Sequence, residues 1–212
     1  MGAAKERRIR SEQLLRERDV PTLESLGTIE SEDEVAIRPP REVAERAIVL
    51  FVVATGAAEF EPDWAIGFLH ARGLWDAATP NEQAFLVSQY PDYEDRIALS
   101  WRYEALWVLL WALGYVETLD FPERACDLPR AADIILGAPV DDFVGRATLR
   151  PAGQILDEAD LIYRCHWATI EARGQEELPG NMDYDVVIER HHALNWLIGY
   201  ANQPWDDVPT DT

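Results

Sequence analysis

Cysteine is scarce in this chain, and Cys126 and Cys165 are the only two among its 212 residues. They lie far apart and have no Cys-x-x-Cys spacing, so the sequence indicates neither a disulfide-rich secreted domain nor a cysteine zinc site. The two thiols permit at most one disulfide. We expect both of them to be reduced.

Basic residues are also few, since 19 Lys and Arg stand against 39 Asp and Glu and leave a formal net charge of −20. Such a negative field repels nucleic acid and anionic lipid, so we expect neither nucleic acid nor a membrane as a partner. No signal peptide is visible, because the basic stretch 5–10 is not followed by an apolar segment. We therefore expect a cytoplasmic protein.

Several sequence motifs of catalysis and cofactor binding are missing. The chain has no glycine-rich phosphate loop, no Gly-x-Ser-x-Gly nucleophile elbow and no His-Glu-x-x-His metal motif. It also lacks any run of alternating polar and apolar residues long enough to require a sheet. We expect no cofactor, and strands over less than about a tenth of the chain.

What the chain does contain is one very apolar stretch near its middle. Every residue from Ala105 to Leu113 is apolar, so a helix over 100–113 should be buried on all sides. The stretch is shorter than the ~20 residues that cross a bilayer, and Gly114 can supply a left-handed helix end. Arg102 and Glu104 lie one turn earlier and need partners from elsewhere in the chain.

The remaining pattern predicts an all-α protein, a single globular domain over 1–212 in which about seven or eight helices surround the buried central helix. Thr79-Pro-Asn-Glu82 is typical of the start of a helix. An N-terminal helix and arm should occupy 1–20, and the acidic C-terminal tail over 201–212 should be solvated. The expected helices span about 1–18, 41–55, 62–72, 79–90, 100–113, 128–136, 151–173 and 186–200, with a brief segment near Phe143.

Two of the later helices place a histidine on their apolar side. His166 lies in the apolar stripe of the helix over 151–173, and His191 lies in that of the helix over 186–200. Asp160 and Arg164 stand four residues apart on a neighbouring face, in the order that favours an ion pair. One interpretation is a core histidine bonded to a carboxylate, beside a surface salt bridge. The other interpretation is a functional site.

The spacing Glu189-x-x-His192 is one by which a single helix can present two metal ligands. A di-iron bundle needs this element twice, but Tyr163 stands three residues before His166, so a di-iron site is not expected. A mononuclear site that combines a histidine with a carboxylate is the alternative. We expect no bound metal, and the candidate ligands under the alternative are His166, Glu189 and His192.

We expect charged and imidazole groups from three helices to meet. Each group loses water when its helix packs, and buried charges are tolerated when they satisfy one another. At least one carboxylate should therefore contact an Arg or His of a different helix. An open cleft would favour binding or catalysis, and a closed cluster would favour architecture. The candidate residues are Arg102, Glu104, Asp160, Arg164, His166, Glu189, Arg190 and His191.

Four segments carry a resemblance that covers nearly the whole chain. They are 100–114, 155–167, 189–196 and 205–212, which read SWRYEALWVLLWALG, ILDEADLIYRCHW, ERHHALNW and WDDVPTDT. In these segments the chain resembles a bacterial family catalogued as domain of unknown function 4272. The resemblance implies one mostly helical domain in a bacterial, intracellular protein. It implies no activity and no catalytic residue.

Without a catalytic motif, we expect a module that binds a protein or a small-molecule ligand, in an accessory or immunity-like role. The alternative is an enzyme that uses a buried cluster of His, Asp, Glu and Arg for acid–base or metal-assisted chemistry. A third interpretation is a purely structural polar network without turnover.

Overall fold

The structure is a computed structural model that describes residues 2–59, 61–175 and 177–212. In these ranges all regular secondary structure is helical, which confirms the predicted all-α class. None of the helices within them is long and apolar enough to cross a membrane. The ten α-helices of the described ranges are α1 (Ala3–Arg16), α2 (Pro40–Ala58), α3 (Pro62–Ala71), α4 (Pro80–Val87), α5 (Tyr93–Ser100), α6 (Arg102–Ala112), α7 (Leu128–Leu136), α8 (Val140–Gly145), α9 (Ala152–Glu171) and α10 (Tyr184–Leu197).

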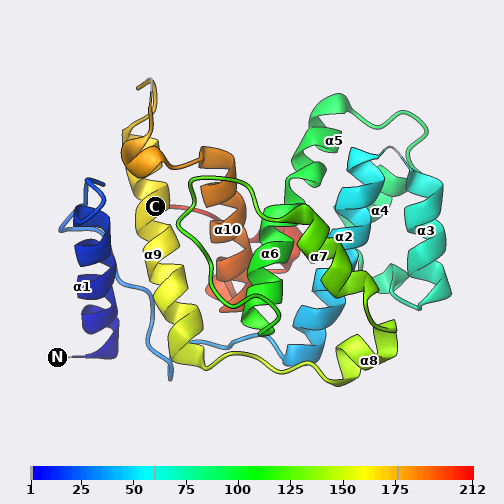
Figure 1. Ribbon diagram of the computed structural model, residues 1–212, viewed down its shortest axis with the longest axis horizontal. Helices are drawn as coiled ribbons and strands as arrows, with labels where there is room; N and C mark the ends of the chain where they lie inside the picture. Colours follow the sequence, from blue (N-terminus) through cyan, green and yellow to red (C-terminus); the bar gives the residue numbers. More distant parts are fainter. Residues whose placement is uncertain (1, 60, 176) are drawn as a thin grey trace.

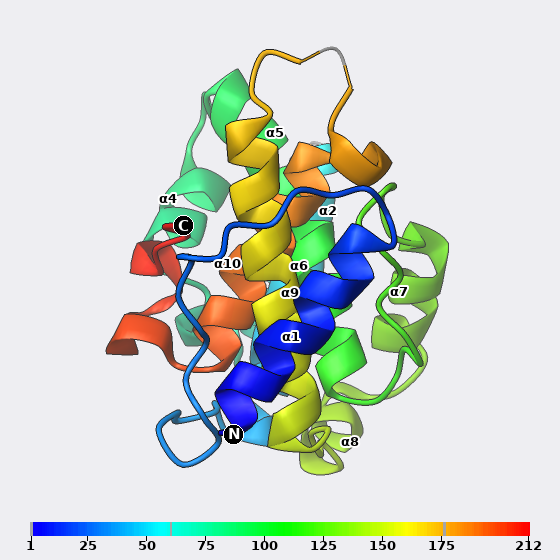
Figure 2. The same ribbon diagram turned by 90° about the vertical axis from the view of Figure 1, so that its left-hand side faces the viewer.

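The helices pack side by side along the long axis of the molecule (Figure 1). α1 lies on α9, α9 packs on α10, and α10 packs on α6. On its other side α6 contacts α2, α2 packs against α3, and α4 contacts both α2 and α3. The view turned by 90° shows α1 crossing the outer face of α9 (Figure 2). The helices that carry the candidate residues, α6, α9 and α10, therefore lie between α1 and α2.

The predicted central helix is α6, and it is buried as expected. From Ala105 to Leu113 only Trp107 is partly exposed. Gly114 has φ +83° and ends the helix with the left-handed conformation that the sequence indicates. α2 is buried to a similar degree between Val43 and Ala54, because it packs against α3, α5 and α6. The core is therefore built on two buried helices, α2 and α6.

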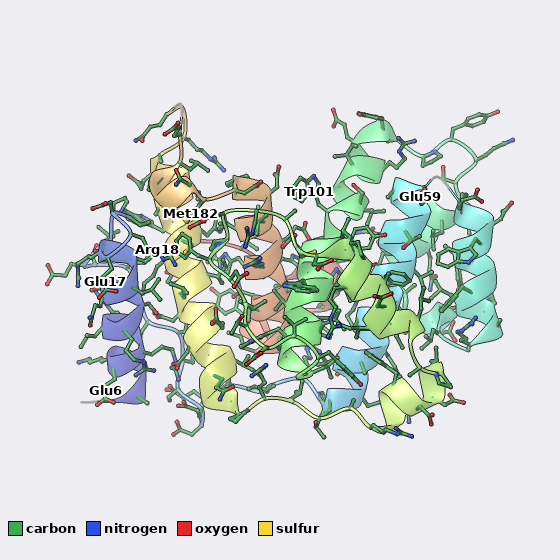
Figure 3. All side chains as sticks on the ribbon, viewed as in Figure 1. Glu6, Glu17, Arg18, Glu59, Trp101 and Met182 are labelled. Carbon is green, nitrogen blue, oxygen red and sulfur yellow. The ribbon has the colours of Figure 1, made fainter. Side chains whose placement is uncertain are left out.

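α5 is the helix that the apolar pattern does not predict. None of its side chains is buried, and its eight residues are too few for a helical period to stand out. Its local signal is Asp92, whose carboxylate accepts the Glu94 backbone N–H at 2.7 Å and caps the helix. Trp101 stands at the junction of α5 and α6 (Figure 3). Together with the six-residue α8 around Phe143, α5 raises the number of helices above the expected seven or eight.

The C-terminal tail is anchored to the protein at Trp205 and Val208, so the expectation of a solvated segment is wrong at these two positions, although 201–204, Asp207 and Asp211 are exposed. Trp205 is 4% exposed, and its ring centroid lies 5.2 Å from that of Trp196. Val208 is buried as well, and the Asn195 amide donates to the Pro209 carbonyl at 2.9 Å. Acidic composition is misleading here, because one large indole provides enough apolar area to hold a short segment against α10.

The N-terminal helix forms where the sequence predicts it. Arg7 fastens α1 to its surroundings, since its Nε donates to Asp157 of α9 at 3.0 Å and a terminal nitrogen donates to Glu32 at 2.8 Å. The Arg7 side chain is buried by these contacts. α1 therefore covers α9. A cavity lies at the edge of this contact.

Candidate functional site

Two ion pairs join α6 to α10. Arg102 donates to both carboxylate oxygens of Glu189 at 3.1 Å, and Arg190 donates from two nitrogens to Glu104 at 3.4 Å. The second pair is closed to solvent, since Glu104 is 1% exposed. The predicted contact between a carboxylate and an arginine of different helices is therefore present twice. Burial raises the pKa of Glu189, and the nearby Arg102 opposes that shift.

The two inward histidines contact each other across the interface of α9 and α10. His166 Nδ1 lies 2.8 Å from His191 Nδ1, so the partner of His166 is a second imidazole and the expected carboxylate is absent from this contact. Asn195 fixes the direction of the hydrogen bonds. Its amide nitrogen donates to the Pro209 carbonyl and also lies 3.1 Å from His191 Nε2. His191 Nε2 must then accept, so His191 donates from Nδ1 and the proton of His166 is on Nε2.

The histidine pair is uncharged at neutral pH. Burial lowers the pKa of His166 to about 4, and the positive charge of Arg173 adds to this effect. Burial also lowers the pKa of His191 to about 3, with contributions from His166 and His192. His166 Nε2 is buried and has no hydrogen-bond partner among the described residues. Both imidazoles are buried, and the pair is suited to holding two helices together.

Asp160 and Arg164 form the predicted i,i+4 ion pair, but the expectation of a surface salt bridge is wrong. Arg164 donates to both oxygens of Asp160 at 2.8 and 2.9 Å. Asp160 is 0% and Arg164 2% exposed, and Arg164 also donates to the Gly27 carbonyl at 3.0 Å. The segment before α2 and the helix α1 cover this side of α9, an effect of tertiary structure that helical spacing does not reveal.

The eight candidate residues thus form four pairs instead of one cluster. In the described ranges, no direct hydrogen bond or ion pair joins one of these pairs to another. The pairs are largely buried and each of these side chains has a partner, although Arg102 Nε and His166 Nε2 are buried without a hydrogen bond to any described residue. Paired, buried charges favour architecture over chemistry. Three of these residues also line cavities: Arg190 lines one at the edge of α9, Arg102 one beside α4 and α5, and His191 one beside the C-terminal tail.

The three candidate metal ligands have different partners. His166 contacts His191, Glu189 pairs with Arg102, and the ring of His192 packs against Trp205 at 4.7 Å. Burial lowers the pKa of His192 to about 3. Throughout 2–59, 61–175 and 177–212, no three or more His, Cys, Asp or Glu side chains are grouped so that they could hold a metal ion.

A cavity of about 260 Å³ opens at the edge of α9, and we call it the α9 cavity. Its polar groups are Arg18, Asp120, Glu158 and Arg190. Figure 3 shows Arg18 beyond the end of α1, toward α9. The apolar part of the wall comes from α1, α9, α10 and the segment after α6, and consists of Leu14, Leu119, Phe121, Pro122, Leu161, Ile162, Cys165 and Leu194.

Glu158 is the distinctive group of the α9 cavity. Its carboxyl group forms no hydrogen bond or ion pair with any described residue. Removal from water raises the pKa of Glu158 to about 7, and the positive charge of Arg190 opposes this shift. Cys165 lines the same wall, but burial raises the pKa of its thiol to about 12, so it stays protonated and unreactive.

Sequence reasoning missed Glu158, although a signal was present. Glu158 stands three residues after Ile155 and four before Ile162, so it lies within the apolar stripe of α9. A carboxylate at such a position loses water when the helix packs.

Comparison with known proteins places the chain in a family. A family model described as Domain of unknown function (DUF4272) matches residues 7–208. The chain therefore belongs to this family. No curated protein and no solved structure matches the chain.

Proposed function

We propose that this DUF4272 protein is a binding module that takes a small molecule into the α9 cavity, where Glu158 recognises it. The observation that carries the proposal is a partly buried carboxyl group that lines an accessible cavity and has no hydrogen bond or ion pair with any described residue. Each of the eight residues expected to form the site has a partner, whereas Glu158 has none among the described residues. We also propose a cytoplasmic location, which fractionation of cells producing the protein would test.

The energetics of Glu158 support a binding role. Burying an ionisable group without a partner costs stability, and the group responds by shifting its pKa toward the neutral form. An apolar residue of similar size would fill this part of α9 at lower cost. Groups that reduce stability in this way cluster where a protein binds or transforms a ligand.

The shape of the α9 cavity limits the ligand. Its volume of about 260 Å³ is just below the ~300–1,000 Å³ of typical ligand pockets, so the ligand is small. Leu161, Ile162 and Leu194 offer apolar contact, while Glu158 supplies a polar group at one wall. This combination suits a molecule with an apolar body and one polar end.

The proposal can be tested by titrating a mixed panel of small amines, alcohols, amides and carboxylates into the labelled protein and following backbone amide signals by NMR. We expect at least one class to shift signals of α9 and α10 around Glu158 and Arg190. Leu161→Phe, which fills the cavity, should abolish these shifts. Leu128→Phe, at an exposed leucine of α7, is the matched control and should leave them unchanged.

If no member of the panel shifts these signals in the unmodified protein, the proposed binding function is wrong. Shifts that persist in Leu161→Phe would place the binding elsewhere.

Acid–base catalysis is a second candidate for the same cavity. A pKa of about 7 leaves Glu158 able to accept or donate a proton near neutral pH, as a general acid or base must. Incubating bound panel members with the protein and recording their NMR spectra over hours would reveal turnover. Loss of turnover with retained binding in Glu158→Gln would support catalysis.

A further inference from the structure

We infer that the α9 cavity selects a protonated amine with an apolar body, and that the Glu158 carboxylate is its counter-ion. This inference rests on the proposed binding function and names the class of ligand. It follows from the charges that surround the cavity, from the nature of its remaining wall and from the charge of the whole chain.

The arginines that line the cavity are already occupied. Arg190 donates from Nε and one terminal nitrogen to Glu104, and from the other terminal nitrogen to the Asp120 carbonyl at 2.6 Å. Arg18 donates to Glu123 at 3.0 Å, and its guanidinium lies 4.3 Å from the centroid of the Phe121 ring. An anionic ligand would have to break the contacts of Arg190, whereas the half-exposed Arg18 keeps free donors but already shares its charge with Glu123.

The two carboxylates that line the cavity, Asp120 and Glu158, differ in whether they have an arginine partner. The carboxylate of Asp120 has Arg124 at 3.8 Å, and both side chains are well exposed to water. Among the described residues Glu158 has no such partner, and its side chain is only partly exposed to water. The charge that is left uncompensated in the cavity is therefore negative, and a ligand ammonium group would compensate it through a charge-assisted hydrogen bond.

The rest of the molecule agrees with a cationic, partly apolar ligand. Beyond Glu158 the cavity wall includes Leu161, Ile162 and Leu194, which can cover a hydrocarbon body. The formal net charge of −20 raises the concentration of cations near the surface and speeds their encounter with the protein.

Binding of an amine should depend on pH because Glu158 must be ionised. Burial raises the pKa of Glu158, Arg190 and Arg150 lower it, and Asp157 raises it. The other charged groups at the cavity are Arg18 and Asp120, and Cys165 faces it as a neutral thiol. An ammonium ion would stabilise the carboxylate and lower its pKa, so uptake of the amine near pH 6.5 should release a proton into solution.

The test compares three probes with the same six-carbon chain: n-hexylamine, 1-hexanol and hexanoate. NMR titration at pH 8 should show hexylamine binding around Glu158 at least about tenfold more tightly than either of the other two. The affinity for hexylamine should fall about tenfold between pH 8 and pH 5.5, as Glu158 takes up a proton. Hexanol binding should not change with pH.

The matched variants are Glu158→Gln and Glu171→Gln. Both remove one negative charge from α9, but Glu171 is exposed at the far end of the helix. Glu158→Gln should remove the preference for hexylamine over hexanol together with its pH dependence. Glu171→Gln should keep both.

Equal or tighter binding of hexanol or hexanoate would overturn the inference and leave the proposed function standing. An amine preference that persists in Glu158→Gln would overturn it too, because attraction by the whole chain would then explain it. If none of the three probes binds, the inference is wrong, and the mixed panel then decides whether the binding function fails with it.

Discussion

Arg190 belongs both to the α6–α10 interface and to the wall of the α9 cavity. The two regions differ in whether their carboxylate is paired. In the interface, Glu104 is closed to solvent and paired with Arg190. In the cavity, Glu158 feels the positive charge of the same arginine but forms no hydrogen bond or ion pair with any described residue. A buried charge with a partner can hold helices in register. A charge that loses water without gaining a partner lowers the stability of the fold, and a bound ligand of opposite charge can offset that loss.

The largest change in the free energy of unfolding should follow from breaking the buried ion pair of Glu104 and Arg190. Glu104→Gln leaves the guanidinium of Arg190 without its counter-charge, and we expect unfolding in urea to show a loss of about 3–5 kcal/mol. The control is Asp142→Asn on α8, which breaks an exposed pair with Arg146 at 3.7 Å and should cost less than about 0.5 kcal/mol. A loss below about 1 kcal/mol in Glu104→Gln would remove the contrast between the two regions.

A smaller loss of folding stability should occur when the pH is lowered, because the buried pair of His166 and His191 is uncharged in the folded protein. The pKa values of His166 and His191 are lowered from 6.5 to about 4 and about 3 in the folded protein. The unfolded chain therefore takes up protons first as the pH falls below 6.5, and stability decreases. Between pH 7.5 and 5.5 the pair should account for a loss of about 2–3 kcal/mol.

The measurement is the dependence of the urea midpoint on pH. His191→Gln should weaken this dependence by removing one of the two groups. The control is His70→Gln, at an exposed histidine of α3, which should leave it unaltered. An unchanged pH dependence in His191→Gln would contradict the closed, uncharged state of the pair.

The smallest effect, and the one with the opposite sign, should come from the cavity. The pKa of Glu158 is raised from 4.5 to about 7 in the folded protein, so its ionisation costs stability as the pH rises through this range. Glu158→Gln should therefore be more stable than the unmodified protein by about 1–2 kcal/mol at pH 8, allowing for partial exposure. The gain should shrink toward zero near pH 4.5.

Thermal or urea unfolding of the two proteins at several pH values would measure this gain. Glu171→Gln, which removes an equal charge at an exposed position, should give no comparable change. A loss of stability in Glu158→Gln at pH 8 would mean that the carboxylate has a stabilising partner, and the comparison between the two regions would fail.

Much of the fold was predictable because it follows from local pattern. The apolar run from Ala105 to Leu113 required a covered helix, and Gly114 marked its end. Capping groups and proline marked the starts of α4 and α9. The need of Arg102 and Glu104 for partners also followed from the sequence, because charges beside an apolar run lose water when it packs. Their partners, Glu189 and Arg190, belong to the expected set.

Tertiary structure decided which charged side chains found a partner and which stayed accessible to a ligand. Helical spacing could not show that α1 and the segment before α2 cover Asp160 and Arg164, or that Trp205 brings the tail onto α10. It could not distinguish the paired Glu104 from the unpaired Glu158 either, although both lie beside apolar stripes. The physical reason is that periodicity defines the face on which a side chain lies, whereas its partners and its access to water depend on elements distant in the chain.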